Sequence, residues 1–170
     1  MNQAIEKLRR MPKSIYESSF PKQFLSRQKG YIYFQDFLPD NKFDTRITVI
    51  GNRAFGFKRN NRPNDFRASG SGQIIYDTEG IDKRCIAIAF GIVAKLNAQS
   101  LAFDFILDKN HDPQITEISY CYQNKAIYDC PGYWDDKMSW HESHVWPEDA
   151  ILIDLLDEIS KEKGTINDAN

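Results

Sequence analysis

The spacing of apolar residues along the chain predicts a mixture of strands and helices. Six runs alternate apolar with polar residues or are rich in aromatic and β-branched ones, a pattern typical of strands. These runs are residues 31–38, 45–50, 53–59, 73–77, 101–107 and 114–122. Apolar residues at helical spacing predict a helix over 81–96 and another that begins at Pro147. We therefore expect an α+β fold in which an antiparallel sheet packs against helices.

The segments between these elements contain turn and helix-end signals. Gly51-Asn52 joins two predicted strands, and glycine at the first central position favours a two-residue hairpin of type II′. The last helix has acidic residues in its first turn, lysines in its last turn and then Gly164, where we expect it to end. Its expected buried stripe is Ile151, Leu152, Leu155, Leu156 and Ile159. The aromatic segment 128–146 shows no regular period and is expected to be irregular.

The length of 170 residues is typical of one domain. Ala4, Leu8, Met11 and Ile15 fall at helical spacing near the N-terminus. We expect an N-terminal helical segment over 1–30, one domain over 31–164 and a flexible tail over 165–170.

Composition and charge narrow the range of functions. The chain has 22 basic and 24 acidic side chains, so it lacks the basic excess of proteins that neutralise nucleic-acid phosphates. The N-terminus is charged throughout, and the longest apolar run, 85–93, is too short to span a bilayer. Three cysteines, one of them in that run, indicate free thiols of a reducing compartment. We expect a cytoplasmic protein with neither a nucleic-acid nor a membrane partner.

Two acidic residues, Asp104 and Glu117, occupy unusual places among apolar neighbours in predicted strands. If the turn centres on Asn110-His111, residues whose numbers sum to 221 face each other, and these two acids do. Their Cβ atoms would then lie about 5 Å apart, and the like charges repel unless a cation lies between them or one is protonated. Mg²⁺ is suited to such a pair, and Ser119 on the same face could add an oxygen. The alternative is a different register with one acid in solvent.

Five basic residues crowd around the first hairpin and its exit loop. They are Arg46, Lys58, Arg59, Arg62 and Arg67. With the turn at Gly51-Asn52, Asp44 faces Arg59, and Arg46 lies on the same side of the sheet. Arginine forks suit phosphate or carboxylate, and the loop 67–72 offers backbone and hydroxyl donors. Together with the acidic pair, the cluster is typical of a site for metal-bound polyphosphate, whereas the alternative is a solvated hairpin paired with nearby aspartates.

Other candidate sites are weaker. The set Cys121, Cys130, His141 and His144 contains zinc-ligand residue types, but its cysteine spacing is far from that of zinc fingers. A nucleophilic Cys/His pair lacks a nameable orienting partner. The aromatic residues of 128–146 could stack on a sugar or base, although such residues more often wrap a core.

Six segments follow one another between about Tyr31 and Trp146 in a recognisable order. They are YFQDFLPDNKFDTRITVIGNRAFGFKR, NDFRASGSG, SLAFDFILD, TEISYCY, CPGYWD and WHES. In these segments the chain resembles ATP-grasp proteins, in the branch that includes ribosomal-protein glutamate ligases and ATP-grasp proteins of polysaccharide clusters. The resemblance implies the ATP-grasp C-terminal subdomain and the binding of ATP and Mg²⁺ for ligation of a carboxylate to an amine or thiol.

The resemblance also implies roles for single residues. Residues Gln35, Asp36, Phe37 and Leu38 match the hinge strand whose backbone holds adenine, and Asp40 or Asn41 would reach the ribose.

Further roles concern the phosphates and the metal. Arg46 matches the arginine of a D-x-R motif that faces phosphate or acyl phosphate, and Arg59, with Lys58 beside it, matches a basic position after the hairpin. Arg67 matches the arginine of a Gly-rich loop. The two Mg²⁺-binding acids correspond to Asp104 and Glu117, and Ser119 stands where many members have asparagine.

A lysine-bearing lobe precedes the matching region in that family, and thirty residues are too few for it. The resemblance therefore implies either a truncated, inactive product or a chain completed by a partner that supplies the lobe. The substrates would be ATP and a small-molecule or peptide carboxylate. The alternative is a non-catalytic binding module derived from such a domain, contacting a protein or glycan.

Overall fold

The computed structural model describes residues 32, 34–68 and 70–167, with side chains through residue 161. The chain divides into two units, 1–36 and 37–170, and the helices and strands described below belong to the second. The helix expected within residues 1–30 lies outside the described residues.

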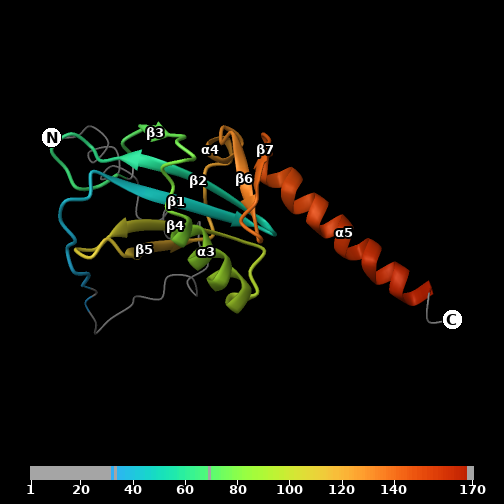
Figure 1. Cartoon of the computed structure of the whole chain (residues 1–170). Coiled ribbons are helices and arrows are strands. Elements are labelled where there is room, and N and C mark those ends of the chain that lie inside the picture. The colour runs from blue at the N-terminus through green and yellow to red at the C-terminus, as the bar shows by residue number, and fades with distance from the viewer. Residues whose placement is uncertain (1–31, 33, 69, 168–170) are drawn as a thin grey trace, which may run out of the picture. The chain divides into compact units, whose positions relative to one another are not determined.

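Seven strands of the second unit form one antiparallel sheet (Figure 1). Their order is β5-β4-β1-β2-β6-β7, and β3 also pairs with β2. The elements are β1 Phe43–Ile50, β2 Arg53–Asn60, β3 Ile74–Ile75, α3 Lys83–Leu96, β4 Ser100–Leu107, β5 Pro113–Ser119, α4 Asn124–Tyr128, β6 Gly132–Asp135, β7 Trp140–Glu142 and α5 Pro147–Asn167. The antiparallel α+β arrangement is confirmed.

The hairpin between β1 and β2 has the predicted two-residue turn. Ile50 pairs with Arg53 across it, and Asp44 pairs with Arg59 at its open end. Gly51 has φ +56°, which favours glycine, and an added Cβ would lie 2.0 Å from Oδ2 of Asp154 in α5. Only glycine therefore lets α5 approach this turn so closely.

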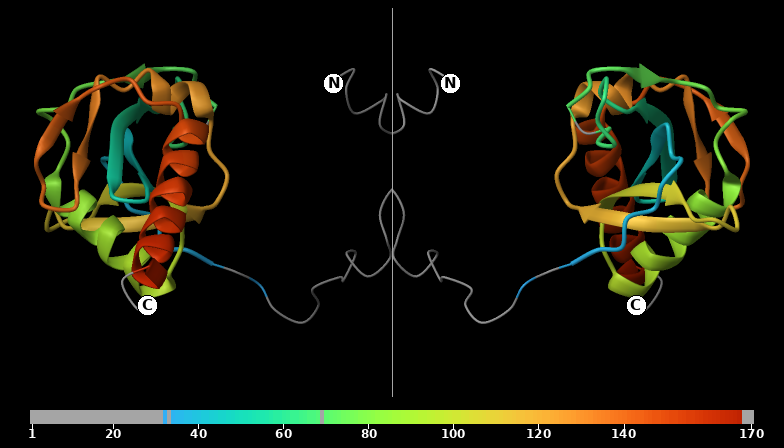
Figure 2. Two further views of the ribbon diagram at one scale, coloured as in Figure 1. Left: turned by 90° about the vertical axis from the view of Figure 1, so that its right-hand side faces the viewer. Right: turned by 90° about the vertical axis from the view of Figure 1, so that its left-hand side faces the viewer.

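Each face of the sheet carries its own core. The alternation of side chains along β1, β2 and β4 sends one set toward α3 and the other toward α4 (Figures 1 and 2). The first core includes Ile47, Val49, Phe103 and Phe105 beneath α3. The second core includes Ile50, Phe55, Phe57 and Ile127, the last of these from α4.

The helix predicted over 81–96 is α3, and its ends have clear physical causes. Oδ1 of Asp82 accepts a hydrogen bond from the backbone N–H of Arg84 at 2.8 Å and caps the first turn. Asn97 ends the helix in the left-handed conformation, with φ 48°.

The β4–β5 hairpin contains a bulge that the sequence did not reveal. Near the turn Phe105 pairs with Ile115, whereas further along Asp104 pairs with Glu117, so Thr116 is the extra residue. The predicted pairing of the two acids is confirmed. The predicted turn register is off by one, and the bulge corrects it.

Two predictions of local structure are wrong. Ile32 and residues 34–38 lie in no strand, although 31–38 reads as one. Aromatic composition favours a strand only where a neighbouring strand pairs with it, and none pairs with these described residues. The segment 128–146, expected to be irregular, contains the β6–β7 hairpin, whose strands are too short to show a period.

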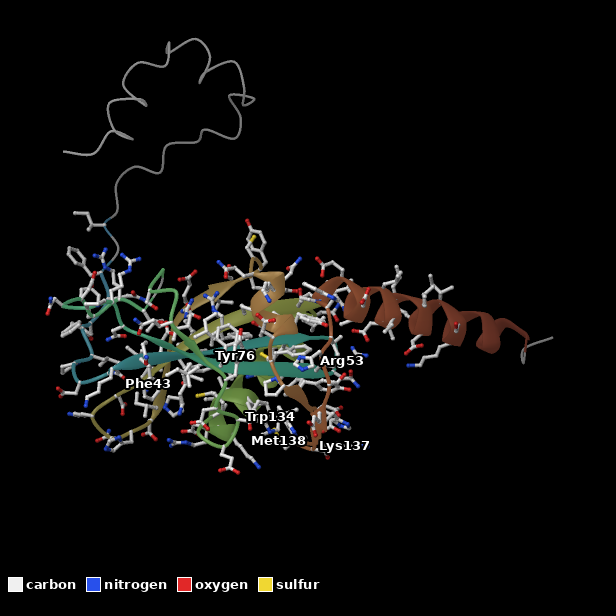
Figure 3. The ribbon with its side chains drawn as sticks, turned by 90° about the horizontal axis from the view of Figure 1, so that it is seen from above. Phe43, Arg53, Tyr76, Trp134, Lys137 and Met138 are labelled. Atoms are coloured by element: carbon white, nitrogen blue, oxygen red, sulfur yellow. The ribbon has the colours of Figure 1, made fainter. Side chains whose placement is uncertain are left out.

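The last helix, α5, turns the acidic side chain of Asp154 toward the end of the sheet. Asp154 accepts hydrogen bonds from Nη1 of Arg53 at 2.7 Å and from Nε2 of Gln99 at 3.1 Å. Figure 3 shows Arg53 at the end of the sheet from which α5 extends. These contacts fix the polar side of α5 against the β1–β2 turn.

The apolar side of α5 is largely exposed. Between 38% and 54% of the surface is accessible at Leu152, Ile153, Leu155, Leu156 and Ile159. The expected buried stripe is therefore wrong except for Ile151, which packs against the second core. The helix also continues through Gly164 to Asn167, past its expected end.

Candidate anion-binding site

Strands β1, β2 and β4 bring two arginines and two aspartates together on the face of the second core. Asp44 is the register partner of Arg59, and Arg46 is the register partner of Asp104. The first pairing follows from the hairpin turn and was predicted. The second joins strands far apart in the sequence and was not.

The four side chains form a continuous chain of charge-assisted hydrogen bonds. Arg46 donates to Asp104 from Nε to Oδ1 at 2.6 Å and from Nη2 to Oδ2 at 2.8 Å. Arg59 donates to Asp44 from Nε to Oδ1 at 2.8 Å and from Nη2 to Oδ2 at 2.5 Å. Nη2 of Arg59 also donates to Oδ2 of Asp104 at 2.7 Å, which links the two pairs. Paired forks of this kind hold both guanidinium planes rigidly.

Because these side chains are buried, each charge needs the opposite charge beside it to stay ionised. The side chains of Asp104 and Arg59 are only 6% and 12% exposed. Burial raises the pKa of Asp44, and the hydrogen bond and charge of Arg59 act against that rise. Burial also disfavours the Arg59 cation, but Asp44 and Asp104 outweigh it and raise the pKa of Arg59. Removing one member would leave a buried, uncompensated charge.

Each arginine keeps donors for a ligand. Arginine has five N–H donors, and both side chains use only Nε and Nη2 for the carboxylates. Within the described part of the chain, Nη1 of Arg46 and Nη1 of Arg59 make no hydrogen bond. A bound anion could therefore be held without breaking the network.

The two arginines line a cavity of about 540 Å³. This volume falls in the range of roughly 300–1,000 Å³ found for small-molecule sites. Its apolar wall includes Phe57, Ile74 and Ile127, and the loop 70–73 borders it. The cavity thus combines cationic donors with an apolar surface, as an amphipathic ligand requires.

Glu117 also lines the cavity, but its surroundings differ from those of Asp104. Its side chain is exposed and makes neither a hydrogen bond nor an ion pair with any residue that the structure describes. The predicted juxtaposition with Asp104 is real, yet the cation beside Asp104 is an arginine pair. The repulsion that suggested Mg²⁺ is relieved by Arg46 and Arg59.

A bare Mg²⁺ does not fit the predicted set as its side chains stand. Both oxygens of Asp104 already accept from guanidinium groups, and the Ser119 hydroxyl is engaged with Cys121 through bonds of 3.0 and 3.1 Å. No cluster of three or more His, Cys, Asp or Glu side chains suited to a metal occurs among the described residues.

The remaining basic residues of the predicted cluster lie elsewhere. Lys58 is on the opposite face of β2, where its Nζ donates to Asp77 at 3.2 Å. Arg67 is 60% exposed and pairs with Asp65 at 2.6 Å. Lys58, Arg62 and Arg67 do not line the cavity.

The predicted adenine-binding residues that belong to the second unit do not line the cavity. Phe37 is exposed, with its ring centroid 5.3 Å from that of Phe66, and Asp40 is an exposed turn residue with φ 68°. Leu38 is half-buried and does not line the cavity. Gln35 and Asp36 belong to the first unit.

The candidate zinc ligands are engaged separately. Nε2 of His141 lies 2.8 Å from Oδ2 of Asp135, and Nδ1 of His144 lies 2.8 Å from the carbonyl of Tyr128. Cys130 is buried, whereas Cys121 is exposed and lines the cavity. The described side chains therefore assemble neither the zinc set nor a Cys/His pair.

The aromatic residues of 128–146 pack mainly on one another. Tyr128 stacks on Trp146 with centroids 4.2 Å apart, and Trp134, buried in the first core, lies 4.6 Å from Trp140. None of these four rings lines the cavity. The wrapping role fits these contacts better than a stacking platform at the site.

Several cavity residues were missed by sequence reasoning. Phe57, Ile74, Tyr122, Gln123 and Ile127 come from β2, β3, the segment after β5 and α4. Phe57 had a usable signal, because it lies two residues from Arg59 and so shares its face of the strand. The others converge only through the tertiary fold.

Comparisons with known proteins add no assignment: no protein-family model matches the chain, and no curated protein matches it. Among the helices of the described residues, none has both the length and the apolar content needed to cross a membrane.

Proposed function

We propose that the chain is a nucleotide-binding domain of ATP-grasp type in which Arg46 and Arg59 receive phosphate groups. The observation that carries the proposal is the pair of rigid guanidinium forks, each with Nη1 unengaged by the described residues, on one cavity. The order of the D-x-R, Gly-rich and acidic-strand segments supports the same assignment.

The cavity supports a nucleotide for a second reason. Its wall combines Phe57, Ile74, Ile127 and the ring of Tyr122 with the arginines. A planar base with a charged phosphate tail has this combination of apolar and anionic parts. In a complete ligase the same arginines would also stabilise the acyl phosphate of a small-molecule or peptide carboxylate.

The proposal concerns binding. Within the described residues no lysine lines the cavity, so no group there is assigned the lysine's share of the phosphate clamp. In the alternative of a contact module, the exposed apolar side of α5 would be the surface that meets the partner.

Calorimetric titration of the full chain with ATP tests the proposal. We expect saturable binding that Arg46→Gln weakens at least about tenfold, because a charge-assisted hydrogen bond contributes about 1.5–3 kcal/mol. Arg84→Gln is the matched control, since Arg84 is exposed and pairs with Asp82 and Asp112 away from the cavity. Near-UV circular dichroism checks that each variant is folded.

A second readout needs no variant. Cys121 is exposed at the cavity, so bound ATP should slow its reaction with a thiol reagent. Equal ATP affinity in Arg46→Gln and Arg84→Gln, with no protection of Cys121, would overturn the proposal.

A further inference from the structure

The acidic residue between the two arginines has a geometry unlike that of a metal ligand. Oδ1 of Asp104 accepts one hydrogen bond and Oδ2 accepts two, all from guanidinium groups. A dication placed on this carboxylate would either displace these donors or lie against two positive charges. Both are unfavourable in a side chain that is 6% exposed.

The second acid, Glu117, stands apart from the arginine–aspartate network. Glu117 is exposed across the bulged ladder from Asp104 and forms no ion pair with the described arginines. A lone carboxylate supplies Mg²⁺ with a single protein ligand, whereas the guanidinium network is already balanced by Asp44 and Asp104. At the cavity Glu117 is therefore an uncompensated negative charge, which repels an anion unless a metal lies between them.

The same network explains how the site could work without a metal. Asp104 bonds to both arginines and so sets the separation of the two forks, while Asp44 holds Arg59 from its other side. Donors fixed in advance lose little freedom when an anion arrives. Two such forks can share the oxygens of one phosphate group, as a metal ion otherwise does.

We propose that Asp104 is an arginine-positioning residue and that this site binds phosphate-bearing anions without a divalent cation. The inference rests on the proposed phosphate-binding role of Arg46 and Arg59. It goes beyond that role by removing the metal from the site and by making Glu117 an opposing charge.

The test is calorimetric titration of the full chain with inorganic pyrophosphate, once in EDTA and once in excess Mg²⁺. We expect binding in EDTA to be at least as tight as binding in excess Mg²⁺, because Mg²⁺ complexes free pyrophosphate and competes with the site for it. Glu117→Gln should tighten binding in EDTA by about two- to fivefold, because it removes a repelling charge from an exposed position. Glu142→Gln makes the same charge change on exposed β7, away from the cavity, and should leave binding unchanged.

A metal site predicts the opposite sign for the same variant. If Glu117 ligated Mg²⁺, Glu117→Gln would weaken binding, and EDTA would abolish it in the wild-type chain. Either result would overturn the inference, as would the absence of pyrophosphate binding in both buffers.

The positioning role of Asp104 has its own readout. Asp104→Asn, if folded, should weaken pyrophosphate binding in EDTA, where a lost metal ligand would change nothing. If that variant does not fold, the wild-type and Glu117→Gln titrations decide the question. Pyrophosphate binding in EDTA without ATP binding would refute the nucleotide proposal alone, whereas ATP binding only with Mg²⁺ would refute this inference alone.

Discussion

Two threonines, Thr48 and Thr116, differ in whether their hydroxyl groups make a hydrogen bond. Thr48 in β1 is fully buried, and its Oγ1 has no hydrogen-bond partner among the described residues. Thr116 occupies the bulge, where Oγ1 donates to the carbonyl of Asp104 at 3.1 Å. A buried hydroxyl without a hydrogen bond lowers the stability of the fold. A hydroxyl that donates to a backbone carbonyl at a bulge, where the strand ladder is interrupted, raises it.

The same substitution at the two sites should therefore have opposite effects. We expect Thr48→Val to leave the free energy of unfolding unchanged or to raise it by up to about 1 kcal/mol, since the shapes match. Thr116→Val should lower it by about 1–2 kcal/mol, because the hydrogen bond from Oγ1 to the Asp104 carbonyl is lost. Urea denaturation measures both, and equal losses would contradict the assignment.

At the residue scale, the sequence could predict which residues pair across a hairpin. It could not predict pairs between strands that are far apart in the sequence. The hairpin turn places Asp44 against Arg59, and the β4–β5 turn places Asp104 against Glu117. The cation beside Asp104 was predicted to be Mg²⁺ because Arg46 reaches it only through the β1–β4 pairing. Local turns do not encode that pairing.

At the scale of elements, α5 shows that apolar residues at helical spacing need not be buried. Its pattern marks an apolar side, but the neighbours decide which side faces the sheet. Here Arg53 and Gln99 engage Asp154, so the polar side is held inward and Leu156 stays 53% exposed.

This arrangement predicts unequal costs for two similar truncations. Leu156→Ala should change the free energy of unfolding by less than about 1 kcal/mol, because its side chain is half in water already and alanine favours helices. Ile127→Ala in α4 should cost about 2–5 kcal/mol, since Ile127 is 1% exposed in the second core. Thermal or chemical denaturation compares them, and a comparable loss in Leu156→Ala would mean that α5 packs otherwise.

Element length explains why β1, β2, β4 and α3 could be predicted and β6 and β7 could not. The eight-residue strands β1, β2 and β4 contain enough alternation to be recognised, and α3 has both its period and its caps. The strands β6 and β7, of four and three residues, do not. Residues 31–38 have strand composition, yet their described part lacks the pairing that composition cannot supply.

At the scale of the whole molecule, burial separates the three thiols. Burial raises the pKa of Cys85 and of Cys130 to about 12, whereas Cys121 is exposed. Burial also raises the pKa of Tyr76 to about 12. All three groups are stabilised in their neutral forms by the folded state.

The fold should consequently lose stability at alkaline pH. A folded pKa above the unfolded one, here about 12 against 9 for the thiols, contributes stability that is complete below pH 9 and lost as pH rises toward 12. Urea denaturation at pH 7, 8 and 10.5 should show constant stability between the first two and a clear fall at the third.

The same burial predicts the reactivity of the thiols. In the native state one thiol should react rapidly with a thiol reagent, and Cys121→Ser should abolish that phase. Three rapid thiols in the native state would contradict the burial of Cys85 and Cys130.

The cavity is formed only by the whole fold. The sequence therefore indicated which kinds of residue serve the site, but not which residues line it. Arg46, Phe57, Ile74, Glu117 and Ile127 reach one space from five separate elements. Motif order could suggest that arginines and acids serve one site. The fold was needed to show that Lys58 is not part of the cavity, because its side chain lies on the other face of β2.

The extra residue in β5, Thr116, changes the register in which β5 pairs with β4, so the two parts of the strand follow different registers. On the turn side, partners in β4 and β5 have numbers that sum to 220, and beyond Thr116 they sum to 221. Carried on without the offset, the turn-side numbering would place Glu117 opposite Phe103, among the buried rings under α3. An alignment of this chain with any relative must open a one-residue gap at Thr116 wherever the relative has a regular ladder, or it will match Glu117 with a core position.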